Sequence, residues 1–347
     1  MNKRERVYAA LEGQPVDRVP LSLWRHFHKQ DQTPAGLASA TLAFYKRYDF
    51  DLIKLTPSGF YAVEDWGAQV NPSKDDDQPP TLKKPVIKKP EDWRNLTTLS
   101  STAGSYGQAL EAIKLVASQL DKEDAPVLMT VFSPLTLAYK LAGDTLLDHL
   151  QNYPTDVHIG LATIAETTSR FADVALEAGA DGIFFASQLS RAEMLSEEMC
   201  QTFVVRYDLI ALERVKLQPV PLVLHLHGAD THFDTVNQYP AHAVSWHNHE
   251  TGPSIPEALA LTNKTLLTGL DLTTLEQSTP ADIAAQAREA IEQTGGSRLI
   301  LAPACVIPPK TPLENLQAIV ELDRTVIPSL SQTDAERGNE NNERPAF

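Results

Sequence analysis

The chain has only two cysteines in 347 residues, Cys200 and Cys305, so it cannot build a disulfide framework. No apolar run approaches the ~20 residues that a membrane-spanning helix needs, and the polar start M-N-K-R-E-R is unlike a secretory signal. Basic residues are outnumbered, 30 Lys and Arg against 45 Asp and Glu, which gives a net charge of −15. Nucleic acids and anionic membranes need a basic surface, so neither is an expected partner. We expect a soluble, cytoplasmic protein.

A further absence bears on the fold. No G-x-G-x-x-G motif follows any apolar run, which argues against an open dinucleotide-binding sheet. What the sequence does contain is a series of short apolar runs, bounded by turn residues and without strict polar alternation. This pattern is typical of strands buried on both faces of a parallel sheet. We predict eight such strands, at residues 19–24, 51–56, 127–132, 182–187, 221–227, 242–247, 265–271 and 298–303.

Segments with the period of an amphipathic helix lie between these strands. Residues 155–179 keep apolar side chains on one face and close on Gly179, a residue typical of helix C-termini. S-I-P-E at 254–257 and T-P-A-D at 279–282 have the spacing of capping boxes, and T-P-L-E at 311–314 opens a last helix with proline at its first position. Strands and helices therefore alternate along the chain.

Eight such alternations predict an α/β fold, a single (β/α)8 TIM-type barrel over residues 1–330. A doubly wound open sheet is the main alternative. Between the second and third strands, N-P-S-K-D-D-D-Q-P-P and K-K-P-V-I-K-K-P predict an irregular insertion before a helix near residues 106–120. Residues 331–347 are polar and poor in aromatic side chains, which predicts a disordered tail.

The run P-L-V-L-H-L-H-G at 221–228 places two histidines at the end of a predicted strand. Side chains i and i+2 point to the same face of a strand, so His225 and His227 are expected to project into one space. Another apolar run, R-L-I-L-A-P-A-C, ends at Cys305. The carboxyl ends of barrel strands gather at one face, where the two imidazoles and the thiol would meet. This donor set suits Zn²⁺ with one coordination position open.

Histidines concentrate near the ends of the predicted strands, where the chemistry of barrel enzymes collects. Two of them belong to W-H-N-H-E, which follows the sixth strand. From this motif we predict Glu250 or His249 as a fourth metal ligand or as a general acid or base.

The predicted substrate-binding residues also lie just beyond strand ends: Arg25, His28, Lys29, Tyr61 and Gln188. Arg25, with His28 and Lys29, is expected to hold an anionic part of a small-molecule substrate at the rim of the barrel. Tyr61 and Gln188 could add hydrogen bonds. Lys140 fits the surface of a helix instead.

Three segments resemble the uroporphyrinogen decarboxylase family: K-R-E-R-V-Y-A-A-L-E-G-Q-P-V-D-R-V-P, D-F-D-L-I-K-L-T-P-S-G and L-A-P-A-C-V-I-P-P-K-T-P-L-E-N-L. The resemblance covers residues 1–330. It implies a (β/α)8 barrel and a homodimer. The family includes metal-free uroporphyrinogen decarboxylases and zinc-dependent methyltransferases that move methyl groups from a corrinoid protein to a thiol.

The pattern of the decarboxylase branch is broken at four positions. One of its two arginines would fall on Lys29, and its central aspartate near Ser58. Its substrate-contacting tyrosine would fall near Lys140, and its C-terminal histidine on Cys305. These departures argue against decarboxylation of uroporphyrinogen.

The methyltransferase branch has a His-x-Cys pair after the fifth strand and a cysteine after the eighth. The resemblance implies His225 and Cys305 as zinc ligands, with His227 where the first cysteine would be. An imidazole in place of a thiolate leaves the ion less neutralised and a stronger Lewis acid. We therefore favour a zinc-dependent, methyltransferase-like enzyme, with a corrinoid protein as a candidate partner. The alternatives are a metal-free decarboxylase of uroporphyrinogen or another acidic substrate, and a non-catalytic module that binds a small molecule or a corrinoid protein.

Overall fold

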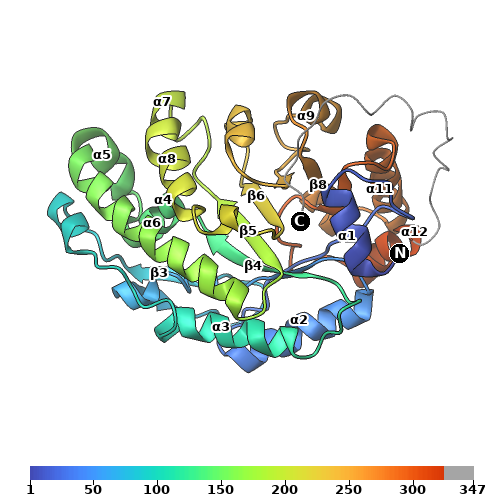
Figure 1. The fold of residues 1–347 in the computed structure, drawn as a ribbon, viewed down its shortest axis with the longest axis horizontal. Helices are drawn as coiled ribbons and strands as arrows, with labels where there is room; N and C mark the ends of the chain where they lie inside the picture. The colour runs from blue at the N-terminus through green and yellow to red at the C-terminus, as the bar shows by residue number, and fades with distance from the viewer. Residues whose placement is uncertain (324–347) are drawn as a thin grey trace.

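A computed structural model describes residues 1–323 of the chain. Its main sheet has seven parallel strands, and their order across the sheet equals their order along the chain (Figure 1). A doubly wound sheet reverses its strand order at one point, so this alternative is excluded. The strands of the main sheet are β1 (Ile53–Leu55), β4 (Val127–Phe132), β5 (Gly182–Ser187), β6 (Leu222–Leu226), β7 (Ala243–Ser245), β8 (Thr265–Leu270) and β9 (Leu299–Pro303).

Seven of the eight predicted strands are confirmed, and β4 and β5 have the predicted bounds. The first predicted strand, residues 19–24, is reduced to a single bridge between Leu21 and Leu301. Its backbone nevertheless bonds to both edges of the sheet: Leu301 N donates to Pro20 O at 2.8 Å, and Asp51 N donates to Leu21 O at 2.7 Å. The segment therefore lies between β9 and β1. Pro20 has no N–H to donate, which shortens the ladder here.

Helices surround the sheet (Figure 1), and contacts run from α2 to α3, from α3 to α6, from α11 to α12, and from α12 back to α2. Among the residues described, no helix is both long and apolar enough to cross a lipid bilayer. The α-helices are α1 (Lys3–Leu11), α2 (Pro34–Tyr48), α3 (Gly104–Ala117), α4 (Pro134–Ala142), α5 (Thr145–Asn152), α6 (Pro154–Glu177), α7 (Glu197–Met199), α8 (Arg206–Ala211), α9 (Ile255–Leu261), α10 (Leu272–Gln277), α11 (Pro280–Thr294) and α12 (Leu313–Asp323).

The predicted helix signals are largely confirmed. Capping boxes begin α9 and α11 at the expected positions, 254–257 and 279–282. Gly179 follows the C-terminal cap of α6 with φ +112°, a conformation that glycine adopts without strain. The last helix, α12, begins at Leu313, one residue later than predicted.

The interval between β1 and β4 holds a small antiparallel sheet of β2 (Gln69–Asn71) and β3 (Thr81–Lys84). We predicted no strands here, because both are short and mostly exposed and so carry no buried apolar pattern. The tail prediction for residues 331–347 lies outside the described residues. The remaining short helices are η1 (Glu64–Trp66), η2 (Pro90–Asn95), η3 (Cys200–Val205), which is a π-helix, η4 (Val215–Leu217) and η5 (Phe233–Gln238).

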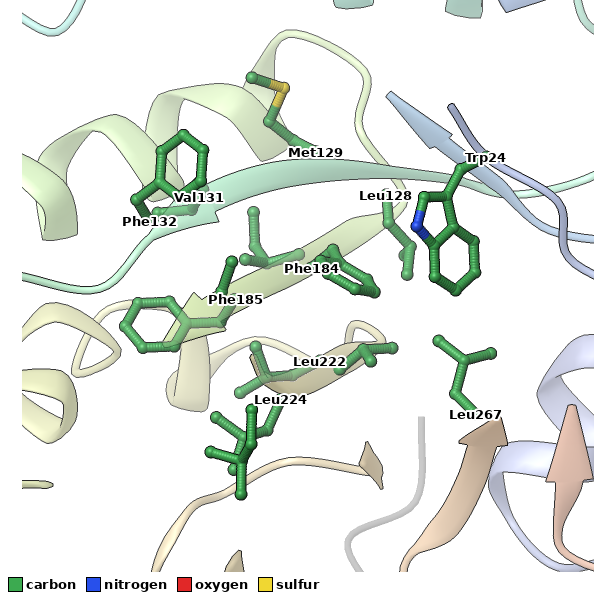
Figure 2. Close-up of a cluster of buried hydrophobic side chains, with 14 of the residues drawn as sticks. Trp24, Leu128, Met129, Val131, Phe132, Phe184, Phe185, Leu222, Leu224 and Leu267 are labelled. Atoms are coloured by element: carbon green, nitrogen blue, oxygen red, sulfur yellow. The ribbon is translucent and has the colours of Figure 1, made fainter. Parts of the chain in front are cut away.

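The space enclosed by the strands is filled by apolar side chains. Figure 2 shows Trp24, Leu128 and Phe184 gathered in this space, while Met129 points to the opposite face of β4. The rings of Trp24 and Phe184 meet edge to face, with centroids 5.6 Å apart. The interior is therefore a packed core, and the ionisable side chains lie toward the strand ends.

A buried ion network ties the start of the chain to the sheet. The Asp51 side chain is fully buried and accepts hydrogen bonds from Arg6 Nη1 and Arg18 Nη1, both at 2.7 Å, and from Leu21 N at 2.9 Å. Both arginines belong to the opening motif. A buried carboxylate is tolerated only when it is paired, so this motif fixes α1 and the segment before β1 against the sheet.

Replacing Asp51 with Asn should lower the free energy of unfolding by about 3–5 kcal/mol, because partly buried Arg18 loses its ion pair with Asp51 and buried Arg6 loses one of its two ion pairs and keeps Asp17. Equilibrium urea unfolding measures the change. The matched control is Asp49→Asn, since Asp49 pairs with Lys3 at a largely exposed site and asparagine tolerates its positive φ. If Asp51→Asn lowers the free energy of unfolding no more than Asp49→Asn does, the ion network does not stabilise the fold.

Candidate metal centre

A cavity of about 220 Å³ lies at the carboxyl ends of the strands. The strand residues in its lining recur at every second position, as expected for side chains that share one face of a pleated strand. They are Lys54 and Thr56, Thr130 and Phe132, Phe184, Ala186 and Gln188, and His225 and His227, joined by Trp24, His26, His28 and Cys305 from adjoining segments.

Three histidines and one cysteine form a cluster beside this cavity, and all of them except His247 line it. One potential ligand atom from each of His225, His227, His247 and Cys305 lies within 4.8 Å of the others. Cys305 Sγ is 3.4 Å from His227 Nδ1, and the rings of His227 and His247 have centroids 4.9 Å apart. The predicted convergence of His225, His227 and Cys305 is therefore confirmed as geometry, and His247 joins them.

The remaining ring nitrogens of two histidines are held by neighbouring side chains. His225 Nδ1 lies 3.1 Å from Ser245 Oγ, and His247 Nδ1 lies 2.6 Å from Glu250 Oε1. His247 Nε2 is buried and has no hydrogen-bond partner in the described part of the chain. A histidine that ligates a metal commonly donates its other N–H to a carboxylate or hydroxyl, which fixes the ring and the tautomer.

The protonation states suit metal binding. Burial, together with the nearby His227 and His247, holds the pKa of His225 well below its ordinary value. Burial, together with the charge of Arg191, lowers the pKa of His227 to about 4. Both rings are therefore neutral at physiological pH, which is the form that binds a metal ion. Burial opposes a charge on His247 as well, but its interactions with Cys305 and Glu250 outweigh this and raise its pKa.

Comparison with known proteins places this chain in a family. The sequence matches the uroporphyrinogen decarboxylase (URO-D) family over residues 2–326. The chain belongs to this family. It is 25% identical over 336 residues to the methylcobamide:CoM methyltransferase MtbA of Methanosarcina acetivorans, covering 92% of this chain and 96% of the relative. It is 26% identical to MtbA of Methanosarcina mazei over 337 residues, with the same coverage.

Among solved structures, a methyltransferase from Methanosarcina mazei superposes with a TM-score of 0.83 at 22% identity, over 93% of this chain and 98% of that one. A B12-independent methionine synthase from Shewanella gives a TM-score of 0.56 at 15% identity, over 89% and 94% of the two chains. These similarities support a TIM-like fold. The expected resemblance to the URO-D family, and to its methyltransferase members, is confirmed.

The fourth side chain of the cluster in this URO-D member is His247, while Glu250 and His249, predicted as a fourth ligand or as a general acid or base, lie outside the cluster. His247 lies two residues beyond Ser245, the end of β7, so both share the inward face. Glu250 contacts the ring of His247 from outside the cluster, and His249 is exposed. The motif W-H-N-H-E could not show which of its two histidines faces inward, because the exact end of the strand decides it.

The cationic side chains in the cavity are Lys54 and Lys140. Lys54 Nζ lies 4.6 Å from the ring centroid of Phe184, and Lys140 Nζ lies 4.9 Å from that of Phe132. Within residues 1–323, neither lysine forms an ion pair with a carboxylate. Burial lowers the pKa of Lys54 to about 7 and that of Lys140 to about 8.

These two lysines were missed from the sequence. Lys140 was interpreted as helix surface, but α4 turns it into the cavity. The sequence did contain a signal for Lys54. This lysine is the only charged residue after Asp51 in the apolar run D-L-I-K-L-T, which forms a buried strand.

The predicted substrate-binding residues lie in three different places. His28 and Gln188 line the cavity. Arg25 and Lys29 do not: the Arg25 guanidinium lies 5.9 Å from the Phe27 ring centroid, and Lys29 is exposed. Tyr61 is part of the core, where its hydroxyl donates to Thr130 O at 2.8 Å. The positive charges of the cavity are therefore deeper in the barrel than the predicted rim.

Replacing Lys54 with Met should stabilise the ligand-free protein at pH 7 by on the order of 3 kcal/mol. The pKa of Lys54 is about 7 in the folded protein and 10.5 ordinarily, so the unfolded chain binds the proton more tightly and protonation favours unfolding. The gain should shrink as the pH rises from 7 toward ~10, where the lysine becomes neutral in both states. Urea unfolding across this range tests it.

The matched control is Lys84→Met, since Lys84 is exposed and should change stability by no more than about 0.5 kcal/mol. A gain for Lys54→Met that is independent of pH would mean that packing, and not charge burial, causes it.

Proposed function

We propose that this chain is a zinc-dependent methyltransferase that moves a methyl group from a methylated corrinoid to a small anionic thiol. The observation that carries the proposal is the convergence of His225, His227, His247 and Cys305 within 4.8 Å at the strand ends. Family membership and the methylcobamide:CoM methyltransferase names of the relatives support it. We also propose that the strands close into a (β/α)8 barrel over residues 1–330 and that the protein forms a homodimer. The closure of the barrel is supported by the backbone bonds of residues 20–21 to both sheet edges.

The donor set fits zinc. Two neutral imidazoles, a third ring oriented by a carboxylate, and one thiol are ligands that Zn²⁺ accepts readily. The buried, unpartnered Nε2 of His247 also points to a missing partner within this cluster. When bound, the ion would supply the Lewis acidity that keeps a substrate sulfur in its thiolate form.

A thiol must lose its proton before its sulfur can attack a methyl carbon. His247 Nε2 would be occupied as a ligand, so this proton would leave through water in the cavity. Glu250 holds His247 Nδ1 at 2.6 Å and so orients Nε2 toward the cluster, which makes Glu250 a positioning residue that acts through His247. The sulfur–carbon bond then forms as the carbon–cobalt bond of the donor breaks, and the bonding electron pair stays on cobalt.

The two buried lysines select the thiol. Lys54 and Lys140 face the same cavity as the cluster and have no carboxylate partner in the described chain. An anionic group on the substrate would restore their ordinary protonation and gain charge-assisted hydrogen bonds away from water. The thiol end would then lie at Cys305 and His227, and the anionic end near the lysines.

The methyl donor can approach from a second cavity, of about 370 Å³. This cavity shares Phe60, Lys140, Gln188 and His227 with the first one, so the two meet beside the cluster. Much of its remaining lining is apolar, including Leu82, Leu189 and Met194, which suits the flat face of a corrinoid carried by a partner protein.

Metal substitution tests the centre. Cobalt-loaded protein should show a thiolate-to-cobalt charge-transfer band, and both His225→Ala and Cys305→Ala should abolish it because each removes a ligand. Glu250→Gln should weaken metal affinity about 10–100-fold, since the orientation of His247 is lost. Absorption spectroscopy with metal titration measures these effects.

The control is His249→Ala, which removes an exposed imidazole from the same motif and should leave the band intact. A protein without metal affinity that decarboxylates uroporphyrinogen would overturn the proposal. A bound metal without methyl transfer to any thiol would show a non-catalytic binding module instead.

Thiol selectivity tests the lysines. With methylcobalamin as donor, Lys54→Met and Lys140→Met should each raise the KM for CoM about 10–100-fold, as expected for the loss of one hydrogen bond to a charged group. The KM for the uncharged 2-mercaptoethanol should change little. Steady-state kinetics of both thiols measures the difference, with Lys84→Met as the surface control.

A parallel measurement on Lys29→Met separates the two possible anion sites. If this variant raises the KM for CoM and Lys54→Met does not, the anionic group is held at the rim, as the sequence first predicted.

A further inference from the structure

A second cluster of potential ligands lies near the start of the chain. It consists of His26, His28 and Asp31, with one ligand atom of each within 4.8 Å of the others. It shares no residue with the cluster around Cys305. His26 Nδ1, His28 Nδ1 and Asp31 Oδ2 are all buried, and none has a hydrogen-bond partner within residues 1–323.

The backbone explains why these three side chains meet. His26 and His28 are two residues apart where an irregular segment enters a turn, and their rings stack with centroids 4.9 Å apart. The chain then turns, and Asp31 N donates to Phe27 O at 2.7 Å. This turn brings Asp31 Oδ2 to 3.7 Å from His28 Nδ1, which is longer than a hydrogen bond.

The side chains are too deeply buried for bulk water to satisfy them. His28 is 5% exposed and the Asp31 side chain 4%. Buried polar atoms without partners are uncommon in folded proteins, because each has lost its hydrogen bonds to water without replacement. Three side chains that each carry such an atom, and that each place a ligand atom within 4.8 Å of the others, therefore indicate a shared partner.

We propose that His26, His28 and Asp31 form a second metal site, which binds a divalent transition-metal ion such as Zn²⁺, Fe²⁺ or Co²⁺. Two imidazoles and one carboxylate are a donor set for these ions, whereas Ca²⁺ and Mg²⁺ prefer oxygen ligands throughout. Three protein ligands leave coordination positions open for water or for an oxygen of a ligand.

Charges of both signs lie around the cluster, with Lys54 and Lys140 near His26 and Asp76 near Asp31. Burial, with the nearby Lys54 and His28, lowers the pKa of His26 to about 3, so this imidazole is in its neutral, metal-binding form. Burial raises the pKa of Asp31. A cation would favour its carboxylate form, and Asp76, which accepts from Lys29 N at 3.0 Å, adds a further negative charge nearby.

The site lies between two cavities. His28 lines the cavity that holds the Cys305 cluster, and it also lines a neighbouring one of about 280 Å³, together with Asp31. An ion here would be reachable from both, and would add a positive charge to the wall that faces the substrate cavity.

Metal counting on the full-length chain tests the site. Wild-type protein loaded with Co²⁺ and freed of excess metal should hold two ions per chain by elemental analysis. His28→Ala and the milder Asp31→Asn should each hold one ion and retain the thiolate-to-cobalt band. Cys305→Ala should lose the band and retain one ion. The proposal for each metal site can therefore be contradicted without affecting the proposal for the other.

His249→Ala removes an exposed imidazole and controls for metal bound loosely at the surface; it should hold two ions. Circular dichroism and the urea midpoint of each metal-free variant show whether it is folded. If wild-type protein and folded Asp31→Asn hold the same number of ions, the second site does not exist, whatever the result at Cys305.

Discussion

The constraint on which the site depends is the period of two in a pleated strand. Every second residue points inward, and the strands of a parallel sheet all end at the same edge. Below that edge the inward positions hold apolar side chains such as Phe184, which close the interior to water (Figure 2). At the edge the same positions hold His225, His227 and Lys54. Strand geometry alone thus separates a dry core from a layer of ionisable groups.

The position of that layer also depends on contacts at the opposite, amino-terminal ends of the strands. Asp51 precedes β1, three residues before Lys54, and is fixed by two arginines from the opening motif. The same carboxylate accepts from the backbone of Leu21, in the segment that leads to His26 and His28. One buried ion network therefore sets the register of two segments that each supply polar side chains to the cavity.

Much of the fold was predictable because buried parallel strands have a distinctive pattern and the caps of α9 and α11 are local motifs. The strands β2 and β3 were not, since they are exposed and lack that pattern. His225, His227 and Cys305 were predictable because each ends an apolar run. His247 was not distinguished from His249, and Lys140 was assigned to a surface, because the end of β7 and the packing of α4 depend on tertiary contacts.

Lys54 and Lys140 also link the cavity to the folding of the whole chain. Each loses hydration on folding and gains no carboxylate partner among residues 1–323, so the folded state carries an electrostatic cost that an anion in the cavity would relieve. Any molecule that binds only the native state shifts the folding equilibrium toward it. In a cell, the amount of intact protein would then follow the supply of its own acidic ligand, with scarcity increasing turnover by proteases.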